Sequence, residues 1–498
     1  MSSASKKQQR RLSNLHLAVK EFASLSRRSF VVGTVTAIAA PLLVKGLVNI
    51  ADALAAEGEA VRRSAHSLHN TDPEVKLLRD AVQKLKLDGN AVGSWTHLAS
   101  YHKIMCGPNW PVIDWDQEVH FGWWFLPWHR LQLLVAERHL QAAVEETSLA
   151  LAYWDWYENA AIPEIYLGQD NPLNDPTRAP KGPKMGRRDL GVLTEAEMID
   201  FDSFGPFGGR EPPTGLGELP GFPGRLETGP HNGGHGFIMG NMRDFATAAL
   251  DPIFYAHHGN IDRLWEVWRN AVQPGTRVPP SESRWKTRPF SFQAPQSELQ
   301  WLVADTVDLS GLGYRYDTIH PKEAIVMVQA SELVGPLAAG GEISVDLGSA
   351  ANKMAEFDLA GSGISVKPQL PKEPGLSTAL SETPAAELAS NRKLILRLEG
   401  VKLPSQSVAI DVHLNTSAPA SSLAPDEASY VGSINLVPPR PGIAMKGGGI
   451  TAEIDLSRRA KDADGSVADL TLTLVPYDPD GKITSESVKV DRLELLIQ

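Results

Sequence analysis

The sequence predicts a mainly α-helical core with long loops, built as a four-helix bundle and followed by an antiparallel β-sandwich. Two observations support this fold class. Apolar residues recur at helical spacing in several segments between 72 and 272, whereas the segments after 392 alternate apolar and polar residues. All 12 tryptophans lie at or before Trp301, so the composition changes where the pattern changes.

Four segments of the first part have the helical pattern, and they are residues 72–88, 94–106, 126–146 and 251–272. Pro127 stands in the first turn of the third segment, where proline is tolerated. In the fourth segment Asp251 is expected as the N-cap and Pro252 as the first helical residue. Residues 157–230 are rich in proline and glycine, which indicates long loops over a helical core.

Six segments of the C-terminal part predict strands, and they are residues 393–400, 408–415, 428–437, 450–456, 469–476 and 490–498. Turn residues separate them, as is typical of an antiparallel sandwich. The expected domains are therefore 56–322 for the helical part, 323–391 for a connecting segment and 392–498 for the sandwich. Within the connecting segment, the Pro-, Ser- and Ala-rich stretch 366–391 predicts a mobile linker or exposed loop.

Residues 1–55 have the features of a twin-arginine export signal. The Arg27–Arg28 pair precedes a mildly apolar run, and Ala53-Leu54-Ala55 offers a small-x-small cleavage site. We therefore expect an exported protein, periplasmic or secreted, that meets the twin-arginine translocase; an amphipathic leader helix is the alternative. Pro41 and Lys45 interrupt the apolar run, so no stable membrane anchor is expected after processing.

Charge and cysteine content limit the possible classes of protein. A net charge of −11 argues against a general nucleic-acid binder, which needs a basic face. Cys106 is the only cysteine, so no intramolecular disulfide can form. Asp262 and Arg263 lie in a helical segment, and we expect them to form a buried polar pair that orients either the helices or a ligand imidazole.

Histidines cluster on the predicted helices, and those of interest are His102, His120, His129, His231, His235, His257 and His258. His231 and His235 are four residues apart, a spacing that stacks two imidazoles on one helix face. Helices that each bring histidines inward predict a metal site in the bundle core. Six neutral imidazoles without carboxylates or thiolates favour two copper ions with three nitrogens each, and zinc is the main competing metal.

The segments "FLPWHR", "HNGGH", "DPIFYAHHGNIDRLW" and "GLGYRYD" together resemble the type-3 copper family of tyrosinases and catechol oxidases over roughly residues 60 to 320. The C-terminal part more faintly resembles the β-rich domain of plant-type polyphenol oxidases. The resemblance implies two sets of copper ligands, which are His102, His120 and His129 for the first ion and His231, His235 and His258 for the second. His257 then resembles the neighbour that packs beside the site.

The same resemblance implies roles for four further residues. Cys106 corresponds to a cysteine that forms a thioether with His120, although a buried free thiol is the alternative. Glu227 and Asn232 correspond to residues that hold a water able to deprotonate a phenol; Glu227 could instead cap a helix. Phe245 corresponds to an aromatic gate over the second copper, or else to a core phenylalanine.

The function implied is that of an oxidase that uses two copper ions and O₂ to convert o-diphenols to o-quinones. Whether it also hydroxylates monophenols stays open, and the substrate is expected to be a small phenolic compound. The alternatives are an o-aminophenol oxidase, a haemocyanin-like oxygen binder and a zinc-dependent hydrolase. The resemblance also implies that the C-terminal domain covers the copper entrance and keeps the enzyme latent until it is cleaved or displaced.

Overall fold

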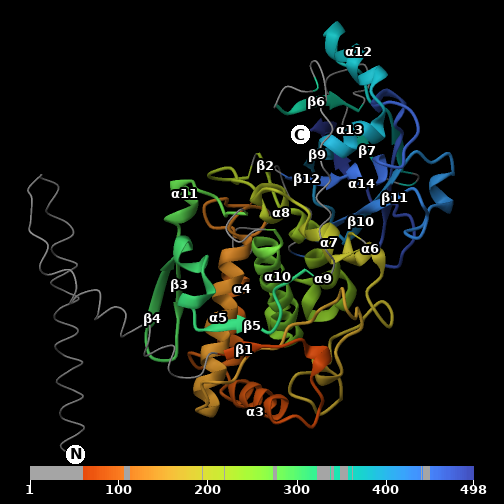
Figure 1. Ribbon diagram of the computed structural model, residues 1–498. Helices are drawn as coiled ribbons and strands as arrows, with labels where there is room; N and C mark the ends of the chain where they lie inside the picture. The colour runs from red at the N-terminus through yellow and green to blue at the C-terminus, as the bar shows by residue number, and fades with distance from the viewer. Residues whose placement is uncertain are drawn as a thin grey trace, which may run out of the picture. The chain divides into compact units, whose positions relative to one another are not determined.

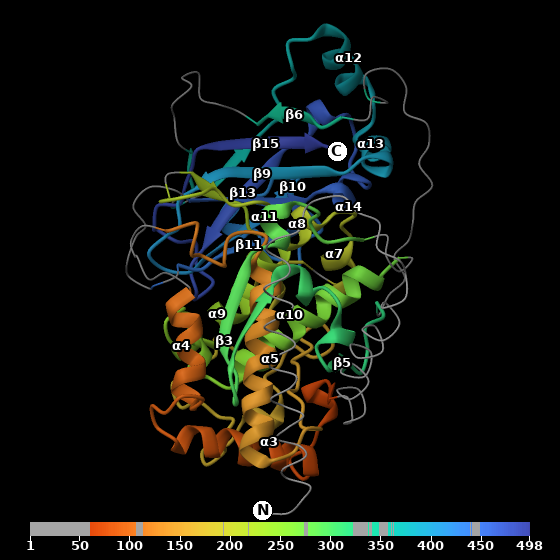
Figure 2. The same cartoon turned by 90° about the vertical axis from the view of Figure 1, so that its left-hand side faces the viewer.

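A computed structural model describes residues 60–105, 113–192, 194–217, 219–272, 277–321, 337, 341–347, 357–359, 361, 363–438, 440 and 449–498. Residues Glu57–Gln498 form one compact unit. The predicted export signal and Cys106 lie outside the described residues. Within the unit, long helices gather at one end and most of the strands at the other (Figures 1 and 2).

The four predicted helices are confirmed, with ends that differ by one or two residues. They are α3 Pro73–Leu87, α4 Trp95–Met105, α5 Phe125–Val144 and α10 Ile253–Asn270. Helix α5 packs against both α3 and α10, which explains why almost its whole circumference is buried, including the polar residues His129, Arg130, Gln132, Glu137 and His139. It ends at Glu145, whose φ of 57° is left-handed. Asp251 precedes α10 and accepts a hydrogen bond from the Ile253 amide at 3.0 Å.

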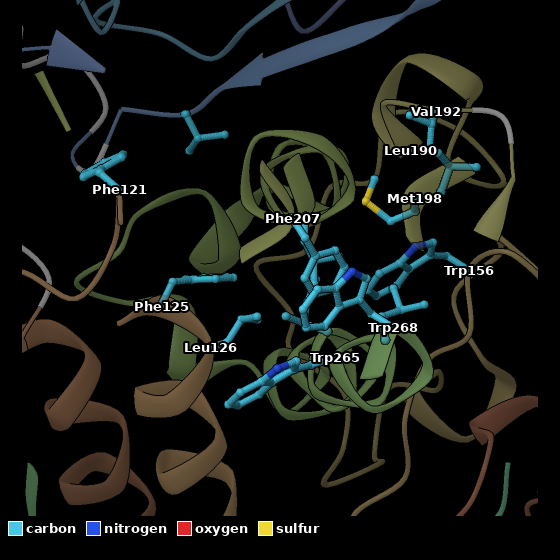
Figure 3. Packing of buried hydrophobic residues seen from close by; sticks show 14 of the residues in the cluster. Phe121, Phe125, Leu126, Trp156, Leu190, Val192, Met198, Phe207, Trp265 and Trp268 are labelled. Atoms are coloured by element: carbon cyan, nitrogen blue, oxygen red, sulfur yellow. The ribbon is translucent and has the colours of Figure 1, made fainter. Parts of the chain in front are cut away.

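Aromatic side chains fill the space between α10 and the long loops. Trp265 and Trp268 of α10 are fully buried, and the Trp268 ring stacks on Phe207 with centroids 4.9 Å apart. Phe207 belongs to the short helix α8 Phe204–Gly208, one of several brief helices in the loop-rich region. Figure 3 shows these rings beside Met198 and Trp156, so the predicted long loops are held down by a continuous apolar core.

Asp262 lies at the centre of a buried polar network. Its carboxylate accepts hydrogen bonds from Arg130 Nε at 2.5 Å, Tyr314 Oη at 2.7 Å and Tyr316 Oη at 2.6 Å. Arg62 Nη1 is 3.3 Å away. Strands β1 Ala60–Arg62 and β5 Tyr314–Tyr316 pair in parallel, and this pairing brings the tyrosines of "GLGYRYD" to α10.

The expected pairing of Asp262 with Arg263 is wrong. Arg263 Nη2 instead bonds Glu195 at 2.5 Å and Asp155 at 3.2 Å. Neighbouring residues on a helix point about 100° apart, so they face different elements of the surrounding structure. The two charges thus anchor α10 to two separate regions of the chain.

Two sheets contain most of the C-terminal strands. The first has the order β11-β10-β13-β8 and is antiparallel, with β11 Tyr430–Leu436, β10 Val408–Leu414, β13 Leu472–Tyr477 and β8 Ile364–Val366. The second has the order β2-β12-β9-β15-β6, with β2 Pro220–Gly221, β12 Gly449–Asp455, β9 Leu394–Val401, β15 Arg492–Ile497 and β6 Ile343–Asp346. All six predicted strands are confirmed; a face-to-face sandwich stays a prediction.

The helical and strand-rich parts share elements. Strand β2 comes from the loop-rich region, yet it pairs in parallel with β12 at the edge of the second sheet. The smaller pairs are β3 Pro289–Gln293 with β4 Glu298–Leu302, and β7 Phe357–Asp358 with β14 Lys489–Val490.

Among the described residues, none of the helices combines the length and apolar character needed to cross a membrane.

The stretch 366–391 is not the linker that its composition predicted. It contains α12 Pro374–Glu382 and α13 Ala385–Asn391. Leu380, Ala385 and Leu388 are fully buried; α12 packs on the 3-10 turn Val467–Asp469, and α13 packs on the short helix α14 Ser457–Ala460. The average polarity of the stretch conceals these few apolar residues, which suffice to dock two short helices.

Candidate metal centre

The predicted histidines come from separate elements and meet in one place. His102 lies on α4, His129 on α5, and His120 on the segment just before α5. Their rings form a first cluster, with centroid distances of 5.2 Å for His102–His120, 5.6 Å for His102–His129 and 4.9 Å for His120–His129. All three are at most 2% exposed, so burial places three imidazoles together without solvent between them.

A second cluster lies directly beside the first. His231 ends the π-helical turn Glu227–His231, His235 lies on α9 Asn232–Ile238, and His258 lies on α10. Ring centroids are 4.6 Å apart for His231–His235, 4.9 Å for His231–His258 and 5.6 Å for His235–His258. The clusters touch where the rings of His129 and His258 stack at 4.3 Å.

The ring nitrogens show a consistent pattern. In five rings Nδ1 faces an acceptor, and the acceptors are Phe245 O for His102, Glu118 Oε1 for His120, Phe125 O for His129, Asn232 Oδ1 for His231 and Met242 O for His235. Within the described part of the chain, Nε2 of each of these rings is buried without a partner. Buried polar atoms are normally satisfied, and ligand histidines normally use the other nitrogen in this way. The rings therefore fit a metal site.

His257 and His258 compete for the last position of the second cluster. Nitrogens of His257, His231 and His235 lie within 4.8 Å of one another, so distance alone admits His257. However, His257 Nε2 is 3.0 Å from the carbonyl of His231, and its ring packs on Trp156 at 4.9 Å. Neither nitrogen of His258 has a partner among the described residues. Hydrogen bonding therefore favours His258, because His257 already uses Nε2 to support the backbone.

Burial keeps these imidazoles neutral. Loss of hydration lowers the pKa of His102 to about 3 and that of His235 to about 4, and it lowers the pKa of His258 far below its ordinary value. A metal ligand must be deprotonated at the coordinating nitrogen. The cluster is thus ready to bind a cation at neutral pH.

Metal-free protein is expected to lose stability as the pH falls from about 6.5 toward 3. The pKa of His102 and that of His235 lie below the value of 6.5 expected for the unfolded chain. Between these limits the unfolded state binds more protons than the folded state, so acid favours unfolding. Thermal melts of the metal-free chain at several pH values will show it. A midpoint that stays constant over this range would contradict burial of neutral imidazoles.

Phe245 forms part of the wall of the first cluster. Its ring lies 4.5 Å from that of His120 and 5.8 Å from that of His102, but 6.5 Å from that of His235. Its carbonyl also accepts the hydrogen bond from His102 Nδ1 at 2.6 Å. The ring therefore lies nearest the first set of histidines, whereas the resemblance placed it over the second.

Glu227 and Asn232 flank His231. The Phe121 amide donates to Glu227 Oε1 at 2.8 Å, and Oε2 is buried without a partner in the described structure. Burial raises the pKa of Glu227 well above its ordinary value. Asn232 Oδ1 accepts from His231 Nδ1 at 3.0 Å, and Asn232 Nδ2 donates to the Asn435 carbonyl at 2.8 Å. Asn232 thus contacts a histidine of the second cluster, and Glu227 contacts the backbone of the residue after His120. The water that these two residues are expected to hold stays a prediction.

Sequence analysis missed Glu118. Its Oε1 accepts from the amides of Val119 and His120 at 2.9 Å each, and it lies 3.2 Å from His120 Nδ1. Burial raises the pKa of Glu118 to about 8. An acidic residue two positions before a candidate ligand was the available signal. The residue supports His120 in the way that outer partners orient metal ligands.

Comparison with known proteins agrees with this geometry. Residues 92–189 and 209–271 match the model of the common central domain of tyrosinase. The chain is 29% identical over 379 residues to a tyrosinase of Hahella sp. (strain CCB-MM4), covering 69% of this chain and 75% of that protein. It is also 29% identical over 259 residues to the latent form of polyphenol oxidase of Prunus armeniaca, covering 45% of this chain and 43% of that protein.

Residues 92–189 and 209–271 match the tyrosinase central domain, and this part of the chain holds all six predicted ligands. The curated relatives that it is similar to include proteins named tyrosinase, polyphenol oxidase and catechol oxidase. It spans 75% of the bacterial relative but only 43% and 63% of the plant enzymes from Prunus armeniaca and Malus domestica. The two histidine clusters suit the two copper ions of a type-3 site.

Solved structures show that the fold extends beyond the central domain. Latent apple tyrosinase superposes with a TM-score of 0.62 at 21% identity, covering 88% of this chain and 97% of that one. Recombinant latent aurone synthase gives 0.64 at 22% identity, with 88% and 90% covered. An octopus haemocyanin unit gives 0.52 at 18% identity, with 88% and 99% covered. At such identities the likeness concerns the fold alone.

Proposed function

We propose that this protein is a dicopper oxidase that uses O₂ to oxidise o-diphenols to o-quinones. The observation that carries the proposal is the pair of touching clusters in which the Nε2 atoms are buried without protein partners. The proposed ligands are His102, His120 and His129 for one ion and His231, His235 and His258 for the other. When bound, the copper pair supplies the redox chemistry with O₂.

The surrounding residues exclude water and orient the substrate. Phe125 packs on His129 at 4.7 Å and on His231 at 4.6 Å, and Phe245 covers His120. Such apolar walls suit a flat phenolic ring, which can lie against an imidazole. In this proposal Phe245 limits how the ring approaches the first cluster.

Hydroxylation of monophenols needs a base close to the substrate hydroxyl. Glu227 supports this part of the proposal because it begins the turn that ends at His231, its Oε2 is buried without a partner among the described residues, and its raised pKa makes it a better proton acceptor once ionised. Asn232 would help Glu227 to hold the water that removes the proton from the substrate hydroxyl. We therefore propose weak monophenol hydroxylation in addition to the oxidation of diphenols.

Copper-loaded protein will test the function directly. It is expected to bind two copper ions per chain and to consume O₂ with 4-methylcatechol, forming the coloured quinone. Tyrosine, tyramine and o-aminophenol, assayed in parallel, define the subtype. Reversible O₂ binding without quinone would indicate an oxygen carrier. Full zinc occupancy with no O₂ consumption would contradict the proposal and favour a hydrolase.

Three further proposals extend the sequence resemblance. Export through the twin-arginine translocase predicts that replacing Arg27 and Arg28 with lysine retains the protein in the cytoplasm.

A Cys106–His120 thioether predicts a peptide mass lower by two hydrogens than the sum of the separate peptides.

Latency predicts that cleavage within 366–373 and removal of the C-terminal fragment raise activity, and unchanged activity would contradict it.

A further inference from the structure

The first sheet reaches the second histidine cluster through strand β11. This strand packs against the π-helical turn Glu227–His231, against α9 and against the short helix α6 Arg187–Leu190. Asn435 lies on β11, within the predicted strand 428–437; it is 6% exposed and was not among the predicted site residues. Its position raises the question of what a buried amide does behind a metal ligand.

The side chain of Asn435 supports the backbone before His231. Its Nδ2 lies 3.1 Å from the Gly229 carbonyl and 3.0 Å from the Arg188 carbonyl. Gly229 has φ −100° and ψ −112°, which interrupts the helical torsions of the turn. Its carbonyl accepts from the backbone amide of Asn232 and also from Asn435 Nδ2, so the side-chain amide adds a second bond to the turn at the point where helical geometry fails.

The backbone of Asn435 supports the residue after His231. Its carbonyl accepts from Asn232 Nδ2 at 2.8 Å, and Asn232 Oδ1 in turn accepts from His231 Nδ1 at 3.0 Å. An acceptor at Nδ1 fixes the tautomer in which Nε2 carries the free lone pair. Asn435, 203 positions away from Asn232, therefore bonds the chain both before and after His231. Its side chain bonds Gly229, and its backbone carbonyl bonds Asn232.

The strand is itself held in register at this place. Asp411 of β10 accepts from Arg188 Nη2 at 2.7 Å and from Ser433 Oγ at 2.5 Å. The Ser433 amide donates to the Gly191 carbonyl at 2.9 Å. Asp411 and Ser433 are fully buried, so these bonds fix β11 against α6 and leave Asn435 little freedom.

The support is confined to the second cluster. The Nδ1 partners in the first cluster are Phe245 O, Glu118 Oε1 and Phe125 O, all within the helical part. We infer that Asn435 is a positioning residue for His231, and that the C-terminal sheet is part of the scaffold of the second copper site. The inference rests on the proposed function, in which His231 is a copper ligand.

Copper retention by full-length Asn435→Ala protein will test the inference. The alanine substitution removes the side-chain bonds to the Gly229 and Arg188 carbonyls and leaves the backbone carbonyl that accepts from Asn232 Nδ2. Loss of an outer hydrogen-bond partner typically weakens metal affinity by about 10–100-fold. We expect chelator competition followed by metal analysis to show one copper per chain retained at wild-type affinity and the other released about 10–100-fold more readily. Asn435→Asp, which keeps the shape but replaces the donor with an acceptor, is expected to release the same ion even if the alanine variant folds poorly.

Ile434→Ala is the matched control. Ile434 is fully buried on the same strand, but successive side chains of a strand point to opposite faces, so it faces away from the turn. Its loss is expected to lower the melting temperature while both copper ions stay bound at wild-type affinity. Wild-type copper affinity in both Asn435 variants, or equal copper loss in the Ile434 variant, would overturn the inference. A wild-type chain that binds no copper would instead overturn the proposed function.

Discussion

Substitution of His258 by alanine is expected to reduce bound copper from two ions per chain to one and to lower turnover of 4-methylcatechol by more than about 100-fold, beyond the range typical of outer partners. Both nitrogens of His258 lack protein partners in the described structure, and its ring stacks on His129 of the other cluster. Removing it leaves the second cluster with two ligands. Metal analysis and a quinone assay on the same preparation will measure both effects.

His257→Gln is the control for this experiment. The glutamine amide can still donate to the His231 carbonyl, which His257 Nε2 approaches at 3.0 Å. Two copper ions are therefore expected to remain, with a moderate loss of stability from the packing on Trp156. If the His257 variant loses one copper and the His258 variant keeps two, then the assignment of ligands on α10 must be reversed.

Replacement of Asp262 by alanine is expected to destabilise the fold by roughly 3–5 kcal/mol, the usual cost of breaking a buried ion pair. Arg130 and Arg62 are fully buried, and both face this carboxylate. Burial acts to raise the pKa of Asp262, but the two guanidinium groups and the tyrosine hydroxyls outweigh it and lower the pKa below its ordinary value. Without the carboxylate, two buried positive charges lose a shared partner.

Chemical denaturation of metal-free protein will measure this effect separately from copper binding. Glu74→Ala is the matched control, because Glu74 pairs with Arg63 at 2.5 Å where both side chains are more than two-fifths exposed. Exposed pairs contribute at most about 1 kcal/mol. A loss for Asp262→Ala no larger than that of the control would show that the network does not hold α10 to β1 and β5.

Local patterns were sufficient for the secondary structure that carries the site. Helices α4, α5 and α10 follow from apolar spacing, with Pro127 in the first turn of α5 and Asp251 and Pro252 just before α10 as further signals. The strands β9, β10 and β11 follow from alternation. Each of these signals depends on residues within one or two turns of one another, so the sequence contains it completely. The prediction failed at 366–391, where a few buried leucines and alanines outweighed a polar average.

The partners of each side chain depend on contacts between distant segments. Asp262 and Arg263 are adjacent, yet the first bonds Arg130 and the second bonds Glu195. The location of Phe245 beside His120, and the contact of Glu118 with the same ring, are likewise outcomes of packing. The spacing of residues along the chain does not show which face of a helix packs against which neighbouring element.

By itself, therefore, the sequence determined the helices, the strands and the set of histidines that could bind metal, because spacing along one element decides which side chains share a face. Only the tertiary structure decided that His258 has free nitrogens while His257 is engaged, and that Asn435 supports His231 from the C-terminal sheet. The physical reason is that a buried polar group needs a hydrogen-bond partner, and the partner is whichever group the fold brings near. That group can be 203 residues away in the sequence, as Asn435 is from Asn232.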